Sequence, residues 1–232
     1  MAVYSLARAE VPKPKHIAQL KFSYRGDTYD YLVYTPEKYE VANAMPALLL
    51  IHGAHGDGAG MLEAWRSFAD KQGIVLVAPT FPLTAAFEDQ VPKLLPELMS
   101  TVGRTWNLDA RRRYVFGYSA GGYSTFTAAT LASDYFAGAA VFACIITPDY
   151  DHIVEGTKRK TPIAIYIGDR DPSFPISKVR RTRDLLEAHG FPVHYVELKN
   201  QDHNYWSAST EVNPDAWRFL SGYTLPDGAA KK

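Results

Sequence analysis

The 232-residue sequence predicts one α/β domain built on a mostly parallel, doubly wound sheet with an antiparallel hairpin at its N-terminal side. Short apolar runs recur along the chain, which is typical of strands covered on both faces. Segments with apolar residues three and four apart lie between these runs and favour helices. No repeat, linker or low-complexity stretch divides the chain. We therefore expect one domain over residues 16–226, with loose ends at 1–15 and 227–232.

The first elements expected are strands. Two strand-forming runs, 17–24 and 29–34, flank Arg25-Gly26-Asp27, whose glycine suits a tight turn, so they predict a β-hairpin. Six apolar runs follow as candidate parallel strands: 47–51, 74–78, 114–116, 139–146, 163–167 and 193–198.

Helical patterns fill the intervals between these strands. They cover 61–69, 91–106, the residues after Ser119, 176–189 and 213–220. Gly73 and Gly190 are expected to end the first and fourth of these helices. Asn213 is expected to cap the last one, with Pro214 at its first helical position. The alternation of strands and helices is what predicts the doubly wound sheet.

Ser119 lies where a strand-forming run gives way to a helical pattern. It stands in the sequence Gly117-Tyr118-Ser119-Ala120-Gly121-Gly122, with a glycine two residues before it and another two residues after it. Such a turn can hold a serine hydroxyl exposed at the end of a strand, because the small residues let neighbouring backbones approach. The same pattern also suits an ordinary tight turn, so its context has to decide.

Other reactive side chains follow neighbouring strands. Asp169 and Asp171 come after the run 163–167, and His203 comes after the run 193–198. The carboxyl ends of parallel strands meet at one edge of a sheet, where reactive groups gather. The order serine, acid, histidine is the chain order of the α/β-hydrolase fold.

These motifs resemble those of the α/β-hydrolase superfamily over nearly the whole chain. The likeness is carried by the segments NLDARRRYVFGYSAGG, HGAHGDG and GDRDPSFP. The sequence is most similar to small serine esterases without a cap domain, namely the feruloyl-esterase and polyhydroxybutyrate-depolymerase-like group and the carboxylesterase/thioesterase group. The resemblance implies an enzyme without a cofactor or metal that hydrolyses carboxylic esters through an acyl-enzyme.

The resemblance also implies roles for the reactive side chains. Ser119 would be the nucleophile, and His203 would be the general base that later protonates the leaving alkoxide. Asp171 matches the family position of the acid that orients the histidine. Asp169, two residues away, is the alternative acid. Asp202 adjoins the histidine and is expected to serve the local turn.

Backbone and aromatic groups complete the expected site. The amides of Ala54 and Ala120 would form the oxyanion hole, which needs N–H donors rather than side chains. Aromatic side chains near the same edge could line a substrate pocket. The candidates are Tyr118, Tyr150, Phe174 and Trp206.

The same residues argue against some alternatives to an esterase and leave others open. The glycines after residue 51 do not give G-x-G-x-x-G, and no lysine stands where a phosphate loop needs one. Asp149, Asp151 and His152 form a polar loop rather than a metal cluster. A peptidase or lyase using the same triad and a binding module with an inactive site stay open, because the fold alone does not exclude them.

Bulk properties bear on partners and compartment. Lys and Arg number 25, as do Asp and Glu, so charge gives no reason to expect a nucleic-acid partner. No apolar stretch is long enough for a transmembrane helix, and the N-terminus lacks the apolar core of a signal peptide. Cys144 is the only cysteine. A cytoplasmic protein and the mature form of a secreted one both fit, and oligomeric state and natural ester stay open.

The spacing of the elements predicts the shape of the site. Residues 147–160 link two expected strands and are too few for a lid domain, although they suffice for a short helix. We therefore expect an open cleft that admits a bulky or polymeric alcohol group. Short acyl or aryl-acyl esters should be preferred, with no activation at a lipid interface.

Overall fold

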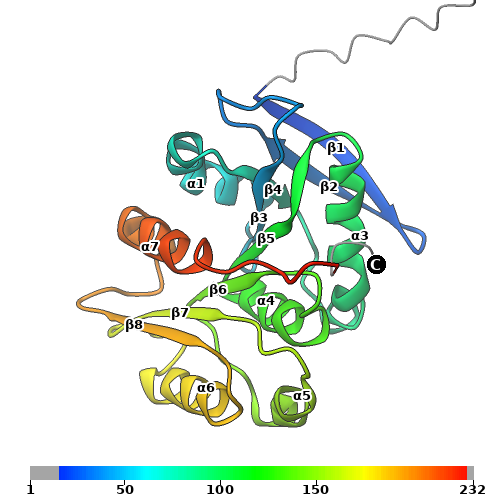
Figure 1. Ribbon diagram of the computed structural model, residues 1–232. Coiled ribbons are helices and arrows are strands. Elements are labelled where there is room, and N and C mark those ends of the chain that lie inside the picture. Colours follow the sequence, from blue (N-terminus) through cyan, green and yellow to red (C-terminus); the bar gives the residue numbers. More distant parts are fainter. Residues whose placement is uncertain (1–15, 229–232) are drawn as a thin grey trace, which may run out of the picture.

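The structure is a computed structural model that describes residues 16–228. An eight-stranded sheet with the order β1-β2-β4-β3-β5-β6-β7-β8 forms its centre (Figure 1). The strands are β1 (Ile17–Tyr24), β2 (Asp27–Tyr34), β3 (Met45–Ile51), β4 (Val75–Pro79), β5 (Leu108–Tyr118), β6 (Gly138–Phe142), β7 (Ile163–Gly168) and β8 (Val193–Leu198). Strands β3 to β8 are parallel, whereas β1 and β2 pair antiparallel. The predicted fold class is confirmed.

Helices cover both faces of this sheet. They are α1 (Gly58–Gln72), α2 (Ala85–Glu88), α3 (Val91–Gly103), α4 (Ala120–Leu131), α5 (Asp151–Gly156), α6 (Ile176–Ala188) and α7 (Tyr205–Leu220), with a 3₁₀ turn η1 (Pro148–Tyr150). Helices α1 and α7 contact each other on one face, and α3, α4, α5 and α6 follow one another on the other (Figure 1). Gly73 ends α1 with a φ of 73°, as predicted.

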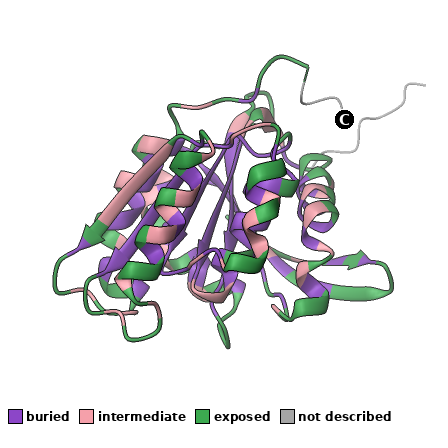
Figure 2. Cartoon of the chain, turned by 90° about the horizontal axis from the view of Figure 1, so that it is seen from below, coloured by how far each residue is buried: buried purple, intermediate pink, exposed green. Residues whose placement is uncertain are grey.

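The core follows from the two helical layers. All six residues of β7 are buried, whereas β1 alternates between exposed and buried or half-buried positions. Figure 2 shows the central strands in the buried colour between helices whose outer surfaces are exposed. Strands covered on both faces must be apolar throughout, which is why the uninterrupted apolar runs predicted them.

The N-terminal hairpin also forms as predicted. Arg25 and Gly26 connect β1 to β2 with φ values of 51° and 95°. Two left-handed residues in a two-residue turn match the right-handed twist of the flanking strands. Of the ends expected to be loose, 1–15 and 227–232, all but residues 227 and 228 lie outside the described residues.

The last helix begins earlier than predicted. Helix α7 starts at Tyr205, where the Asn204 side chain accepts hydrogen bonds from the first turn. Asn213 is therefore no cap, and Pro214 lies inside the helix. The side-chain amide of Asn213 instead donates a hydrogen bond of 2.8 Å to the carbonyl oxygen of Ala64 on α1. The dipeptide Asn-Pro resembles a helix start, but here tertiary packing against α1 explains the asparagine.

Strand β6 is shorter than the predicted run 139–146. It ends at Phe142 because Ala143 takes a left-handed φ of 55°. The chain then leaves the sheet and forms η1 and α5 before β7 begins. No cap domain interrupts the described part of the chain. None of the helices between residues 16 and 228 combines the length and apolar character needed to cross a bilayer.

Candidate active site

Ser119 stands on a strained turn between β5 and α4. Its φ of 52° and ψ of −119° lie outside the regions that residues with a side chain usually adopt. The turn is held because the Ser119 amide donates 2.9 Å to the carbonyl oxygen of Phe142 on β6. A Cβ on Gly117 would overlap the Gly121 carbonyl oxygen, and one on Gly121 would overlap the His52 carbonyl oxygen. The two glycines therefore allow the close backbone approach that the sequence predicted.

The loops after β7 and β8 are joined by their backbones. Asp169 N donates 3.0 Å to the oxygen of Leu198, and Arg170 N donates 2.9 Å to the oxygen of Gln201. Gly168 permits this contact, because a Cβ there would overlap the Gln201 carbonyl group. The first loop carries the candidate acid and the second carries the candidate base, so this junction sets their separation.

Ser119, His203 and Asp171 form a chain of hydrogen bonds. His203 Nε2 lies 2.8 Å from Ser119 Oγ, and His203 Nδ1 lies 2.7 Å from Asp171 Oδ2. The Asp171 side chain is fully buried, whereas His203 keeps 24% of its side chain exposed. With the proton on Nδ1 facing the carboxylate, Nε2 is left to accept the serine proton.

The two candidate acids differ in their surroundings. Asp171 Oδ1 accepts hydrogen bonds from the amides of Ser173 (2.8 Å) and Phe174 (2.9 Å), so both carboxylate oxygens of Asp171 have partners. Asp169 is exposed, and its side chain has no hydrogen-bond partner in the described part of the chain. Asp202 Oδ1 accepts 2.8 Å from the Asn204 amide, which is the turn role expected for it.

The candidate oxyanion donors come from two different segments of the chain. Ala120 is the first residue of α4, and Ala54 follows β3 in an exposed turn. Neither amide donates a hydrogen bond to another residue between 16 and 228. Backbone N–H groups that are free and preoriented are what an oxyanion needs.

His52 supports the loop that carries Ala54, a role that the sequence did not predict. Its imidazole is 3% exposed; Nε2 accepts 2.9 Å from the Phe81 amide, and Nδ1 donates 2.7 Å to the Gly53 oxygen. The ring thus ties the segment after β4 to the segment after β3. Its position directly after an apolar strand was the only signal in the sequence.

Three of the four predicted aromatic residues lie around His203. The Phe174 ring is 5.7 Å from the imidazole, and Tyr118 is 5.3 Å from it. Burial raises the pKa of Tyr118, to which the charges of Asp171 and Asp202 add. Its hydroxyl donates 2.9 Å to the His203 carbonyl oxygen, so this phenol holds the loop of the histidine.

One hollow includes His203, and a second lies along α4. The first, of about 320 Å³, is lined by Tyr118, Pro172, Asp202, His203, Asn204 and the half-exposed Trp206. The second, of about 410 Å³, runs along α4 and includes Tyr123 and Tyr150. Tyr150 lines this second cleft rather than the first, and its hydroxyl is bound to Thr130 Oγ1 at 3.0 Å. Tyr123 joins the two regions, because its ring is 6.5 Å from that of Phe174.

Comparison with known proteins places the chain among hydrolase folds. It is similar to a thermostable esterase (19% identity, TM-score 0.72, covering 90% of this chain and 63% of that one). It is also similar to a fluorophosphonate-binding serine hydrolase from Staphylococcus aureus (16%, TM-score 0.74, 88% and 98%). A third similar structure is a CE1 ferulic acid esterase from Anaeromyces mucronatus (16%, TM-score 0.72, 91% and 92%). At these identities the likeness shows the fold alone.

The family of the chain follows from its sequence. No curated protein matches it closely enough to report. The model of the dienelactone hydrolase family matches residues 79–219, which is more than half of the chain and includes Ser119, Asp171 and His203. Together with the fold this match supports a hydrolase, and the chain belongs to the dienelactone hydrolase family.

Proposed function

We propose that this protein is a serine esterase that cleaves carboxylic esters through an acyl-enzyme. The observation that carries the proposal is the chain of hydrogen bonds from Ser119 Oγ to His203 (2.8 Å) and from His203 to Asp171 (2.7 Å). A serine hydroxyl is a weak nucleophile, and an adjacent base oriented by a third group activates it.

The reaction then proceeds in two halves. Ser119 Oγ attacks the ester carbonyl carbon while its proton passes to His203 Nε2. The carbon–oxygen bond to the alcohol breaks, and the imidazolium gives that proton to the leaving alkoxide. A water molecule repeats the sequence on the acyl-enzyme, releasing the acid and restoring Ser119. Asp171 keeps its charge throughout and stabilises the imidazolium.

The negative charge on the carbonyl oxygen is assigned to the amides of Ala54 and Ala120. Both donors are fixed by the fold: Ala120 begins α4, and Ala54 follows the Gly53 that His52 holds. Donors that are already oriented need no rearrangement when the charge develops, which is why they favour the transition state over the substrate.

The two hollows support a division of the substrate. The leaving group must lie within reach of His203, and the hollow of about 320 Å³ includes that residue. Trp206 in this hollow is about half exposed, so the hollow is open to solvent, which supports a bulky or polymeric alcohol. The cleft of about 410 Å³ has the size of a small-molecule site and suits a short acyl or aryl-acyl group.

Covalent labelling tests the proposal. An organophosphate should add one adduct to the peptide that contains Ser119 and abolish hydrolysis of p-nitrophenyl acetate. Ser119→Ala should lose about 10⁴-fold or more in kcat and take up no label. Ser23→Ala is the matched control, because Ser23 lies on the β1–β2 hairpin, where its hydroxyl is 3.1 Å from that of Thr28. Labelling of another residue, or an active Ser119→Ala variant, would contradict the assignment.

A further inference from the structure

The cleft along α4 contains a carboxyl group, that of Glu88, which has no role in the proposed reaction. Its walls come from α2, the start of α3, the outer face of α4 and the segment after β6. The residues that line it are Ala85, Glu88, Asp89, Pro92, Tyr123, Phe126, Thr127, Leu131, Ile145, Ile146, Thr147 and Tyr150. Most of these side chains are apolar, and Glu88 is an acid held among them.

The cleft begins about one helical turn from the serine. Tyr123, which lines it, is four residues after Ser119, and each helical residue advances about 1.5 Å along the axis. Ser124, which contacts Glu88, lies about 7 to 8 Å beyond Ser119 by the same rise. In the proposed reaction the alcohol leaves on the side of His203, which lines the hollow of about 320 Å³. We therefore assign the acyl group to the other hollow, the cleft along α4.

Glu88 is held in this cleft by one hydrogen bond. Its Oε1 accepts 2.5 Å from Ser124 Oγ. Its Oε2 is buried and has no hydrogen-bond partner among residues 16–228. Burial raises the pKa of this carboxyl to about 7; the charge of Asp89 adds to the rise, and the Ser124 hydrogen bond opposes it.

No positive side chain offsets Glu88 within the part of the chain that the structure describes, since none forms a salt bridge with it. The titratable groups that sense its charge are Asp89 on the same segment and Cys144 and Tyr150 after β6. Burial raises the pKa of the Cys144 thiol and of the Tyr150 phenol, so both are neutral near pH 7. The field in the cleft is therefore set by the carboxylates.

We propose that the cleft along α4 holds the acyl part of the ester and that Glu88 is its specificity-determining residue. It selects acyl groups whose far end is neutral or positively charged and rejects those whose far end carries a carboxylate. This inference rests on the proposed esterase function, because it takes Ser119 as the point of attachment of the acyl group.

The selection depends on the charge of Glu88 and therefore on pH. Above about pH 7 the carboxyl is ionised, and a second negative charge in this poorly solvated cleft is repelled. Below that pH the carboxyl is neutral, and the discrimination by charge weakens. Ionised Glu88 should raise the rate for an ester with a positively charged acyl end and lower the rate for one with a negatively charged end. The ratio of these two rates therefore measures the effect of Glu88.

Three methyl esters of 3-phenylpropanoic acid test the proposal: the unsubstituted ester and those with an aminomethyl or a carboxyl group at the para position. The substituents keep their charges from about pH 6 to about pH 8. Dividing each kcat/KM by that of the unsubstituted ester at the same pH removes any pH dependence that the three esters share. The ratio of cationic to anionic ester should rise about tenfold over this range.

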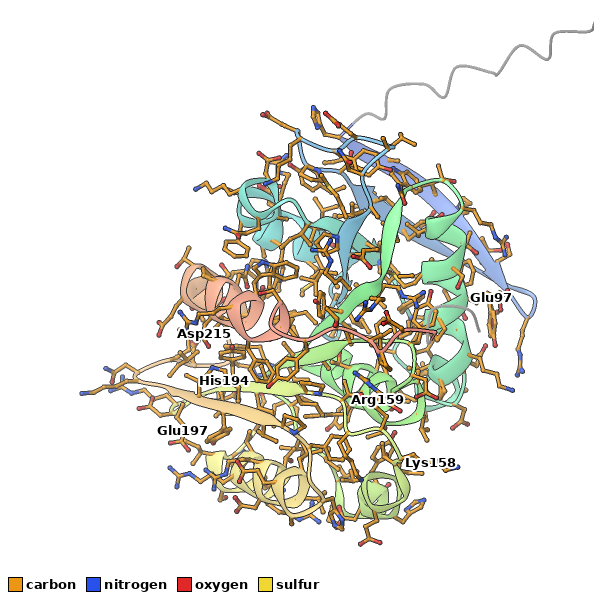
Figure 3. All side chains as sticks on the ribbon, viewed as in Figure 1. Glu97, Lys158, Arg159, His194, Glu197 and Asp215 are labelled. Atoms are coloured by element: carbon orange, nitrogen blue, oxygen red, sulfur yellow. The ribbon has the colours of Figure 1, made fainter. Side chains whose placement is uncertain are left out.

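Glu88→Gln keeps an oxygen that can accept from Ser124 and removes the charge, so its ratio should not change with pH. The matched control is Glu97→Gln, an exposed carboxylate on α3 that Figure 3 labels. Glu97 does not line the cleft, so this variant should keep the wild-type rise. A pH-independent ratio in the wild type, the same rise in Glu88→Gln, or no turnover of any of the three esters overturns the role of Glu88.

Labelling with organophosphate in the same preparations separates the two proposals. If Ser119 is labelled but the ratio of cationic to anionic ester does not rise with pH as expected, the esterase assignment stands and the cleft assignment is wrong. If Ser119 is not labelled, the proposed function is wrong, and the inference about Glu88 is wrong with it.

Discussion

Between residues 16 and 228 the structure contains two close pairs of a histidine and an aspartate, and only one of these pairs contacts a serine hydroxyl. His203 and Asp171 lie after the carboxyl ends of β8 and β7, 2.7 Å apart. His194 is the second residue of β8, and its Nε2 lies 2.6 Å from Asp215 Oδ2 on α7. Figure 3 labels His194 and Asp215 on these two elements. The pairs have nearly equal distances and different surroundings.

The surroundings explain the difference. The far nitrogen of His203 meets Ser119 Oγ, whereas the far nitrogen of His194 has no partner among the described residues. Asp215 also accepts 2.7 Å from the buried hydroxyl of Tyr166 on β7 and pairs with Arg218. This second pair therefore fastens β7 and β8 to α7. A histidine–carboxylate distance alone does not identify a catalytic site, so the proposal for His203 rests also on the strained serine turn and on the free amides of Ala54 and Ala120.

The largest expected effect separates the two pairs by activity. Asp171→Asn should lower kcat by about 10³- to 10⁴-fold, because the amide no longer holds the tautomer in which Nε2 accepts the serine proton. Asp215→Asn should leave kcat within about twofold, since the second pair is not connected to Ser119. Ester hydrolysis by the two variants under identical conditions measures both effects.

Asp169→Asn is the control for position in the same loop, because Asp169 is exposed and its side chain is unpaired in the described residues. A loss in Asp169→Asn that exceeds the loss in Asp171→Asn would make Asp169 the triad acid. A large loss of activity in Asp215→Asn would mean that the second pair contributes to catalysis.

Much of the fold could be predicted because burial leaves a direct trace in the sequence. Strand β8 has the predicted bounds 193–198, and Gly73 ends α1 as expected. The start of α7 could not be predicted in this way, because Asn213-Pro214 has the letters of a helix start. Only the contact between Asn213 and α1 explains why an asparagine lies inside the helix.

The site was predictable to the extent that it depends on strand order. Ser119, Asp171 and His203 each follow a strand, and parallel strands bring such residues to one edge. Their roles stay predictions until activity is measured. The roles of two residues that surround the site could not be predicted from the sequence. His52 acts through the Phe81 amide, 29 residues away, and Glu88 is buried only because α2 folds against α4.

The next largest effect is expected at His52, a histidine that belongs to neither of the two histidine–aspartate pairs. His52→Leu removes the acceptor of the Phe81 amide and the donor to Gly53, so the Ala54 amide should lose its fixed direction. We expect kcat to fall about 10- to 100-fold with KM nearly unchanged, because the oxyanion donor acts mainly in the transition state. The value of kcat and the rate of organophosphate labelling should both be measured, and they should fall together.

His55→Asn provides the matched control in the same loop. His55 is exposed with a φ of 58°, which asparagine adopts readily, and its kcat should stay within about twofold. If His52→Leu lowers thermal stability while kcat stays at the wild-type value, His52 is purely structural and the account of Ala54 is wrong.

The smallest expected effect sharpens the comparison through stability. Hydrogen bonds from Tyr166 and His194 lower the pKa of Asp215 although burial opposes them. A carboxyl with a lowered folded-state pKa stabilises the protein above its unfolded pKa of about 3.9, and this contribution is lost as pH falls below it. Asp215→Asn should therefore lower the free energy of unfolding by about 1 to 2 kcal/mol near neutral pH. The difference from the wild type should shrink at about pH 3.5, as urea unfolding at both pH values can measure. Asp30→Asn removes an exposed partner of Lys21 and should cost under about 0.5 kcal/mol at either pH. If the difference in free energy of unfolding between Asp215→Asn and the wild type grows on acidification, the carboxyl of Asp215 is protonated in the folded protein. The second pair then does not hold α7 to the sheet through a charged carboxylate.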